Sequence, residues 1–181
     1  MSKLLILSAG VSEDSNNTKL AKKLNKFLNE EGIPNEIYEN LHENIPFLLD
    51  NQEDVPKKIL EMRKSLESAD KIIIFSPVYN GGFLAHLKNT LDWLSLSYDG
   101  YKYNSLFKDK TVGVISSVRG GGGNAQNAFD ILSAQLINYG LRVFEEFHLI
   151  TNKEHQADVE IDENQKVFGN IVQYIYRFLN F

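Results

Sequence analysis

Three short, uninterrupted apolar runs constrain the fold of this chain more than any other feature. They occupy residues 4–7 (LLIL), 72–75 (IIIF) and 112–115 (VGVI). Apolar runs of this length without polar alternation are typical of strands buried on both faces, which occur in parallel sheets covered by helices. Two further segments, 33–39 and 141–150, mix charged with apolar residues and are typical of edge strands.

Segments with helical periodicity separate these strands. Their apolar stripes are Leu20, Leu24, Phe27 and Leu28; Val55, Ile59, Met62 and Leu66; a stripe within 83–96; Ala125, Ala128, Phe129, Leu132, Leu136 and Tyr139; and Val167, Ile171, Tyr174 and Phe178 near 162–179. Gly32 is expected to end the first helix, Asp54 to cap the second with Pro56 in its first turn, and Gly140 to follow the fourth.

Five strands that alternate with five helices predict a doubly wound α/β protein. We expect a flavodoxin-like three-layer sandwich around a five-stranded parallel sheet of order 2-1-3-4-5, which puts the two mixed strands at the edges. No repeat, linker or low-complexity segment is recognised, so residues 1–181 are predicted to form one domain.

Composition excludes several classes of function. The net charge of −5 argues against binding to nucleic acid. The chain has no cysteine, which excludes disulfides, thiolate catalysis and cysteine-ligated metal sites, and its four histidines lack the spacing of metal ligands. No stretch is long enough to span a membrane, and the apolar run at 4–7 is too short for a signal peptide. A soluble, cytoplasmic protein without a metal is expected.

The three segments richest in Gly, Ser and Asn follow the first, third and fourth strands, at residues 8–18, 77–82 and 116–123. In a sheet of the predicted order these loops converge at the carboxyl ends of the strands, where ligands bind. The first loop places hydroxyls and an amide at a helix N-terminus, which suits a phosphate, although Ser15 or Asn17 could simply cap the helix. The other two offer bare backbone, so a thin ring could lie between them; a plain surface turn is the alternative.

The segment from Pro77 to Leu94 resembles the signature P-x-Y-N-x-x-x-x-x-x-L-K-N-x-[LI]-D-W of the NADPH-dependent FMN reductases, a family that includes flavin-dependent quinone, azo and chromate reductases. Ser15 and Asn17, followed by Leu20 and Ala21, are similar to its phosphate loop, and 120–126 are similar to its glycine-rich third loop. The resemblance implies hydride transfer from NADPH or NADH to FMN and on to a small-molecule electron acceptor, with no side-chain acid, base or nucleophile.

Carried over by position, the resemblance implies that three loops bind FMN. Their expected cofactor-binding residues are Gly10, Ser12, Ser15, Asn17 and Thr18; Pro77, Val78, Tyr79, Asn80 and Gly81; and Ser117, Arg119, Gly120, Gly121 and Gly122. Ser12 stands where many members have an arginine, and Arg119 where glycine is common. Arg119 could stabilise negative charge on the reduced ring or point to solvent.

The helix over 83–96 carries a second apolar side with Ala85, Trp93 and Leu96, opposite the stripe of Leu84, Leu87, Leu91 and Leu94. This second side predicts a homodimer, or a tetramer, through that helix. Tyr98, Tyr101 and Tyr103 follow in a loop that could cover the flavin of either subunit. The alternative is that Trp93 packs under this loop within its own chain.

Three rival functions differ in identifiable features. A flavodoxin-type FMN electron carrier lacks turnover on nicotinamide; its phosphate loop is usually richer in Thr and Gly and its surface more acidic than here. A Rossmann dehydrogenase carries its glycine fingerprint after the first strand, whereas Gly120-x-Gly122-x-x-Ala125 follows the fourth. A response-regulator-like domain needs an acidic pocket beside a phosphoacceptor Asp after strand 3, where this chain has Ser76 and Pro77.

Overall fold

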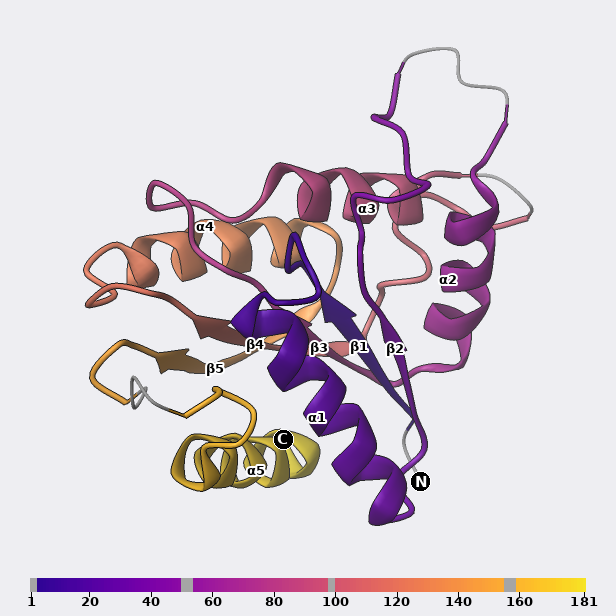
Figure 1. Ribbon diagram of the computed structural model, residues 1–181. Helices are drawn as coiled ribbons and strands as arrows, with labels where there is room; N and C mark the ends of the chain where they lie inside the picture. Colours follow the sequence, from indigo (N-terminus) through magenta and orange to yellow (C-terminus); the bar gives the residue numbers. More distant parts are fainter. Residues whose placement is uncertain (1–2, 50–53, 98–99, 155–158) are drawn as a thin grey trace.

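A computed structural model of the chain describes residues 3–49, 54–97, 100–154 and 159–181. The strands β1 (Leu4–Ser8), β2 (Asn35–Tyr38), β3 (Lys71–Phe75), β4 (Thr111–Ser117) and β5 (Arg142–Ile150) form one parallel sheet of order β2-β1-β3-β4-β5. The helices are α1 (Asn16–Glu30), α2 (Lys57–Ser68), α3 (Ala85–Ser95), α4 (Ala125–Asn138) and α5 (Gln165–Asn180). Helices α1 and α5 cover one face of the sheet, and α2, α3 and α4 cover the other (Figure 1). The predicted fold class is confirmed.

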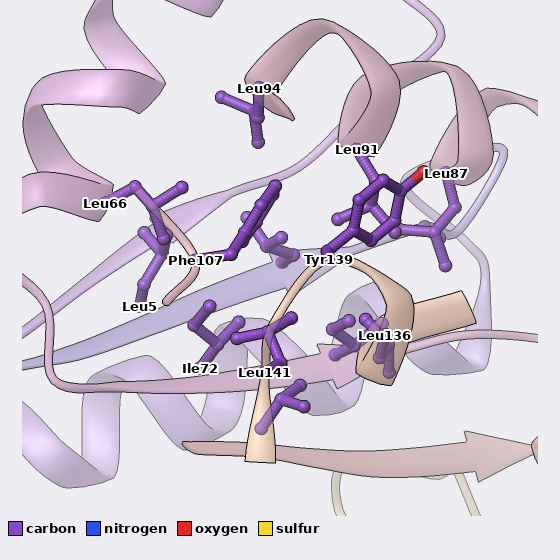
Figure 2. Close-up of a cluster of buried hydrophobic side chains, with 14 of the residues drawn as sticks. Leu5, Leu66, Ile72, Leu87, Leu91, Leu94, Phe107, Leu136, Tyr139 and Leu141 are labelled. Atoms are coloured by element: carbon purple, nitrogen blue, oxygen red, sulfur yellow. The ribbon is translucent and has the colours of Figure 1, made fainter. Parts of the chain in front are cut away.

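The apolar runs are continuous because each strand contributes side chains to two cores. Leu4 and Ile6 of β1 belong to the cluster that packs on α1 and α5, whereas Leu5 and Leu7 belong to the cluster under α2, α3 and α4. Figure 2 shows Leu5 in the second cluster, together with residues that come from all three of its helices and from the segments before β4 and β5. Alternate residues thus point to opposite faces, as the pleat of a strand requires.

The boundaries of α2 and α3 differ from those predicted. Helix α2 begins at Lys57, and Pro56 is its N-cap residue with an extended ψ of 138°, so Pro56 precedes the first turn instead of lying in it. No side chain caps the helix, so the expected capping role of Asp54 is also wrong. Helix α3 was expected over 83–96 and spans Ala85–Ser95, so it is shorter at both ends. Gly32 does follow α1 with a positive φ of 69°, the left-handed conformation in which glycine commonly ends helices.

Trp93 is covered by its own chain, and this corrects the reason for expecting a partner at that residue. Its side chain is 1% exposed, and its Nε1 donates a hydrogen bond of 2.8 Å to the carbonyl of Pro46. The Asn89 amide donates to the same carbonyl at 2.9 Å and accepts from the Leu48 N–H at 2.8 Å. The segment before α2 therefore packs on the side of α3 that was predicted to face another subunit.

The loop after α3 lies at the wrong edge of the sheet to cover a site in its own chain. Tyr101 packs near the Arg63 guanidinium of α2, at 5.7 Å, and Asn104 hydrogen bonds to the carbonyl of Asn138 at the end of α4. Helices that return across a parallel sheet end near the amino ends of its strands, so Tyr101 and the exposed Tyr103 lie opposite the carboxyl edge. Tyr98 lies outside the described residues.

None of the helices in the described part of the chain combines the length and the apolar character that crossing a membrane requires.

Candidate functional site

Strand register brings three loops to one level at the carboxyl edge of the sheet. Ser8 at the end of β1 pairs with Phe75 at the end of β3, and Phe75 pairs with Ile115 of β4. Strand β4 continues past this level and pairs Ser117 with Ile150 of β5. Ser116 and Ser117 were expected in a loop but are strand residues, so β4 extends beyond the ends of β1 and β3 on one side of the site.

A cavity of about 410 Å³ lies between these loops, within the range of roughly 300–1,000 Å³ usual for cofactor sites. It contains predicted site residues from each loop, namely Ser12, Ser15, Asn17, Pro77, Val78, Tyr79, Ser117, Arg119 and Gly120. It also contains residues that were not predicted, namely Val11, Asn16 and Val118. The latter three are immediate neighbours of predicted residues, and the sequence carries no separate signal for them.

The other predicted site residues do not line the cavity; they are Gly10, Thr18, Asn80, Gly81, Gly121 and Gly122. Gly10 and Thr18 are packed together beneath the first loop, where a Cβ on Gly10 would lie 2.1 Å from Thr18 Oγ1. The Thr18 hydroxyl is fully buried and accepts a hydrogen bond of 3.3 Å from Ser8 Oγ. Both residues therefore shape the loop from below.

Asn17 joins the first loop to the third. Its side chain is 2% exposed, and its Nδ2 donates to the carbonyl of Ser117 at 3.0 Å. The N–H of Ser117 donates in turn to Asn17 Oδ1 at 2.9 Å. Both polar atoms of the amide are thus engaged by main chain, so Asn17 fixes the distance between two walls of the cavity.

Ser15 occupies the N-cap position of α1, but its side chain makes no capping hydrogen bond. Asn17 does not cap the helix either, because its amide is hydrogen bonded to the main chain of Ser117. The first turn of α1 thus offers the Ser15 hydroxyl and unpaired backbone N–H groups to the cavity, at the positive end of the helix dipole. This arrangement suits a phosphate group.

The second loop is a tight turn. Tyr79 N–H donates to the Gly82 carbonyl at 3.0 Å and Gly82 N–H donates to Tyr79 at 2.9 Å. The residues between them, Asn80 and Gly81, have φ values of 52° and 75°, as in a type I′ turn, which favours Asn-Gly. The Asn127 amide of α4 holds the turn through the Gly81 carbonyl at 2.8 Å. Asn80 and Gly81 therefore shape the turn, while Tyr79 reaches the cavity.

The glycine run of the third loop is only partly explained by packing. Gly122 has a φ of 76°, and a Cβ there would lie 2.9 Å from Leu149. By contrast, a Cβ on Gly120, Gly121 or Gly123 would meet nothing within 4 Å. The protein itself does not require glycine at these three positions, and open space beside bare backbone suits close approach of a ligand.

Two histidines with lowered pKa values, His86 and His148, do not line the cavity. His86 Nε2 donates to the carbonyl of Ala9 at 3.1 Å, and its ring meets that of His42 edge to face at 5.6 Å. Burial lowers the pKa of His86 below its ordinary value. On β5, burial also lowers the pKa of His148, whose Nε2 has no hydrogen-bond partner. In the described ranges no three His, Asp or Glu side chains group closely enough to hold a metal ion, and His155 lies outside those ranges.

The donors of the cavity fit a flavin mononucleotide. Hydroxyls and a helix N-terminus suit its phosphate, and backbone from two turns can flank a planar ring whose edges carry nitrogen and carbonyl groups. A 2-1-3-4-5 sheet with such a site at its switch point defines a flavodoxin-like protein that binds a nucleotide cofactor. Residues 2–152 match the model of the NADPH-dependent FMN reductases, so the chain belongs to this family. It is an NAD(P)H-dependent flavin enzyme with FMN as its cofactor.

Comparison with individual proteins agrees with this assignment. A probable NADPH:quinone oxidoreductase 2 of Oryza sativa subsp. japonica is 26% identical over 177 residues, which cover 92% of this chain and 77% of that protein. FerB, a flavoenzyme NAD(P)H:(acceptor) oxidoreductase from Paracoccus denitrificans, has a TM-score of 0.75 at 21% identity, covering 99% of this chain and 98% of FerB.

An FMN-dependent NADH-azoreductase from Bacillus anthracis str. Ames Ancestor, solved in complex with FMN, has a TM-score of 0.63 at 17% identity. The match covers 98% of this chain and 99% of the azoreductase. At these identities the two solved structures show that the fold is shared. The family match does not favour the flavodoxin-type electron carrier.

Proposed function

We propose that the enzyme passes electrons from NADPH or NADH to a small oxidant, such as a quinone, an azo compound, free flavin or a metal ion, through FMN bound in the cavity. The observation that carries this proposal is the single cavity shared by the start of α1, the turn at Tyr79 and the end of β4. Family members use the same cofactor. When bound in this cavity, FMN would supply the redox chemistry that links the nicotinamide to the acceptor.

The protein's own part in the reaction is binding and orientation. Ser12, Ser15 and Asn16 line the cavity at the start of α1 and would hold the phosphate, while main chain at Val78 and at Gly120 would flank the ring. Among the described residues that line the cavity, the ionisable side chains are those of Tyr79 and Arg119. We take residues 1–181 as one domain for this function.

Anaerobic stopped-flow mixing tests the proposal. The FMN-loaded enzyme is mixed with NADPH or NADH while the flavin absorbance is followed, and a quinone or azo dye is then added. Rapid bleaching followed by recovery is expected. A protein that stays colourless once excess FMN has been added and the unbound FMN removed would overturn the assignment. Bound flavin that neither nucleotide bleaches would instead support the flavodoxin-type electron carrier.

We further propose a homodimer or tetramer that uses α3 together with residues 45–49. Phe47 and Leu49 are 70% and 69% exposed, and they flank the Leu48 N–H that binds Asn89 of α3. Large exposed apolar side chains of this kind mark protein contacts. Light scattering of wild type and of the Phe47→Asp/Leu49→Asp variant tests this: a dimer that dissociates in the variant is expected, and a wild-type monomer at all concentrations contradicts it. The cytoplasmic location stays a prediction, which cell fractionation can check.

A further inference from the structure

The loop at the phosphate end of the cavity carries negative charge of its own. Ser12 and Ser15 are neutral donors, and the residues between them, Glu13 and Asp14, are exposed carboxylates. An FMN phosphate carries roughly −1.5 to −2 charges near neutral pH, like other phosphate monoesters. The carboxylates oppose such a group, and the partial charge of a helix end offsets this only in part.

The cation nearest in sequence to this loop is already engaged. Lys19 lies in the first turn of α1, and its Nζ is 2.6 Å from Glu160 Oε2 and 3.9 Å from Asp14 Oδ1. Two carboxylates therefore share this ammonium, which leaves it poorly suited to balance a phosphate as well. The first loop and the first turn of its helix do not provide the positive charge that the cofactor's tail calls for.

A cation does reach the same cavity from the opposite wall. Of the described residues that line the cavity, only Arg119 has a positively charged side chain. It follows Ser117 by two residues, and Ser117 is held against the first turn of α1 by Asn17 and by a longer contact of 3.4 Å from Asn16 Nδ2. The hydrogen bonds between the loops thus bring the start of the β4–α4 loop next to the phosphate end.

We propose that Arg119 binds the phosphate of FMN and supplies, from the third loop, the positive charge that the first loop lacks. This inference rests on the proposed function and assigns a residue to one end of its site. A guanidinium suits the role, because its paired N–H donors match two phosphate oxygens. Arg119 then recognises the tail of the cofactor and not its ring, and it sets the preference for FMN over riboflavin.

Binding of the two flavins separates a phosphate role from a ring role. The protein is freed of flavin and titrated with FMN and with riboflavin, and quenching of flavin fluorescence gives both dissociation constants. In Arg119→Ala, FMN affinity is expected to fall about 10- to 100-fold, the loss typical of a charged hydrogen-bonded partner. Riboflavin affinity is expected to change less than about twofold, because riboflavin has no phosphate. Arg119→Lys keeps the charge without the paired donors and is expected to lie in between.

Lys153→Ala provides the matched control. Lys153 is an exposed cation beside the same loop, since the N–H of Asn152 donates to the Gly120 carbonyl at 3.2 Å, but it does not line the cavity. Its variant is expected to bind FMN like wild type. Equal losses of FMN and riboflavin in Arg119→Ala, or no loss of FMN, overturn the inference alone. Wild type that binds neither flavin overturns the proposed function and the inference together.

Discussion

Asn17 and Ser117 are 100 residues apart in the chain and exchange two hydrogen bonds, of 3.0 and 2.9 Å. The amide of Asn17 is buried, so these bonds are shielded from water, and Ser117 lies at the last position of β4. The pair therefore couples the start of α1 to the end of a central strand. It sets the width of the cavity.

Asn17→Ala should destabilise the fold and weaken FMN binding together. It leaves two buried main-chain groups of Ser117 without partners, which should lower the free energy of unfolding by about 2–4 kcal/mol. Urea unfolding of the flavin-free protein measures the first effect and FMN titration the second. Asn16→Ala is the control for stability, because Asn16 makes only a contact of 3.4 Å to Ser117 Oγ. Equal stability losses in the two variants would contradict the assigned role of Asn17.

Gly10→Ala should be costly, whereas Gly123→Ala should be neutral. A Cβ at Gly10 would lie 2.1 Å from Thr18 Oγ1 and 2.8 Å from Ser15 Oγ, while one at Gly123 has nothing within 4 Å. Forcing atoms into a packed site typically costs about 1–3 kcal/mol, and the first loop must shift to accept them. Thermal unfolding and FMN titration should both register the change. Adding Thr18→Ala should restore part of the loss; no restoration would locate the strain elsewhere.

Tyr139→Phe should loosen the contact between α3 and α4. Tyr139 Oη donates to Asp92 Oδ1 at 2.5 Å, and burial together with this carboxylate raises the pKa of the phenol. The variant is expected to lose about 1–2 kcal/mol of unfolding free energy, the low end for a bond to a charged group, since Asp92 keeps its pair with Lys88. Tyr103→Phe, at an exposed tyrosine, should change stability by less than about 0.5 kcal/mol.

Stability should fall as the pH drops below about 6.5. Burial lowers the pKa of His86 and of His148, so the unfolded chain takes up protons at these residues before the folded protein does. Above the ordinary histidine pKa of 6.5 both residues are neutral in the folded and the unfolded states, so they do not affect stability. Below it the unfolded chain is protonated first, and the free energy of unfolding falls. Urea unfolding at pH values between about 5 and 7 measures the slope. The His86→Gln/His148→Gln variant should have a shallower slope, and an unchanged slope would refute the assignment.

The sheet was predictable because its signals are local. The run at 72–75 is apolar at each position, and burial on both faces of a parallel sheet is the arrangement that tolerates such a run. The convergence of three loops followed from the strand order alone. The family signature then pointed to residues within those loops, of which Ser15, Val78 and Gly120 do line the cavity.

The missed features depend on contacts between distant segments. A helical wheel places Trp93 on an apolar side of α3, but it does not show that the segment at Pro46 covers this side and accepts a hydrogen bond from the indole. An amide at Asn17 suits a phosphate and a hydrogen bond to main chain equally well, and only the position of Ser117 shows that the second occurs. Asn80 and Gly81 have the residue types of a binding loop and also of a type I′ turn; the structure shows the turn, and their contact with FMN stays a prediction.

The contact between Trp93 and the Pro46 carbonyl provides an intrinsic fluorescence probe. Trp93 is the single tryptophan of the chain, and its buried indole donates a hydrogen bond to that carbonyl. Its emission therefore reports on one junction, between α3 and the segment that precedes α2. A red shift in that emission would register release of this segment even while the central strands stay paired, so fluorescence and circular dichroism can follow two different parts of the same molecule as it opens.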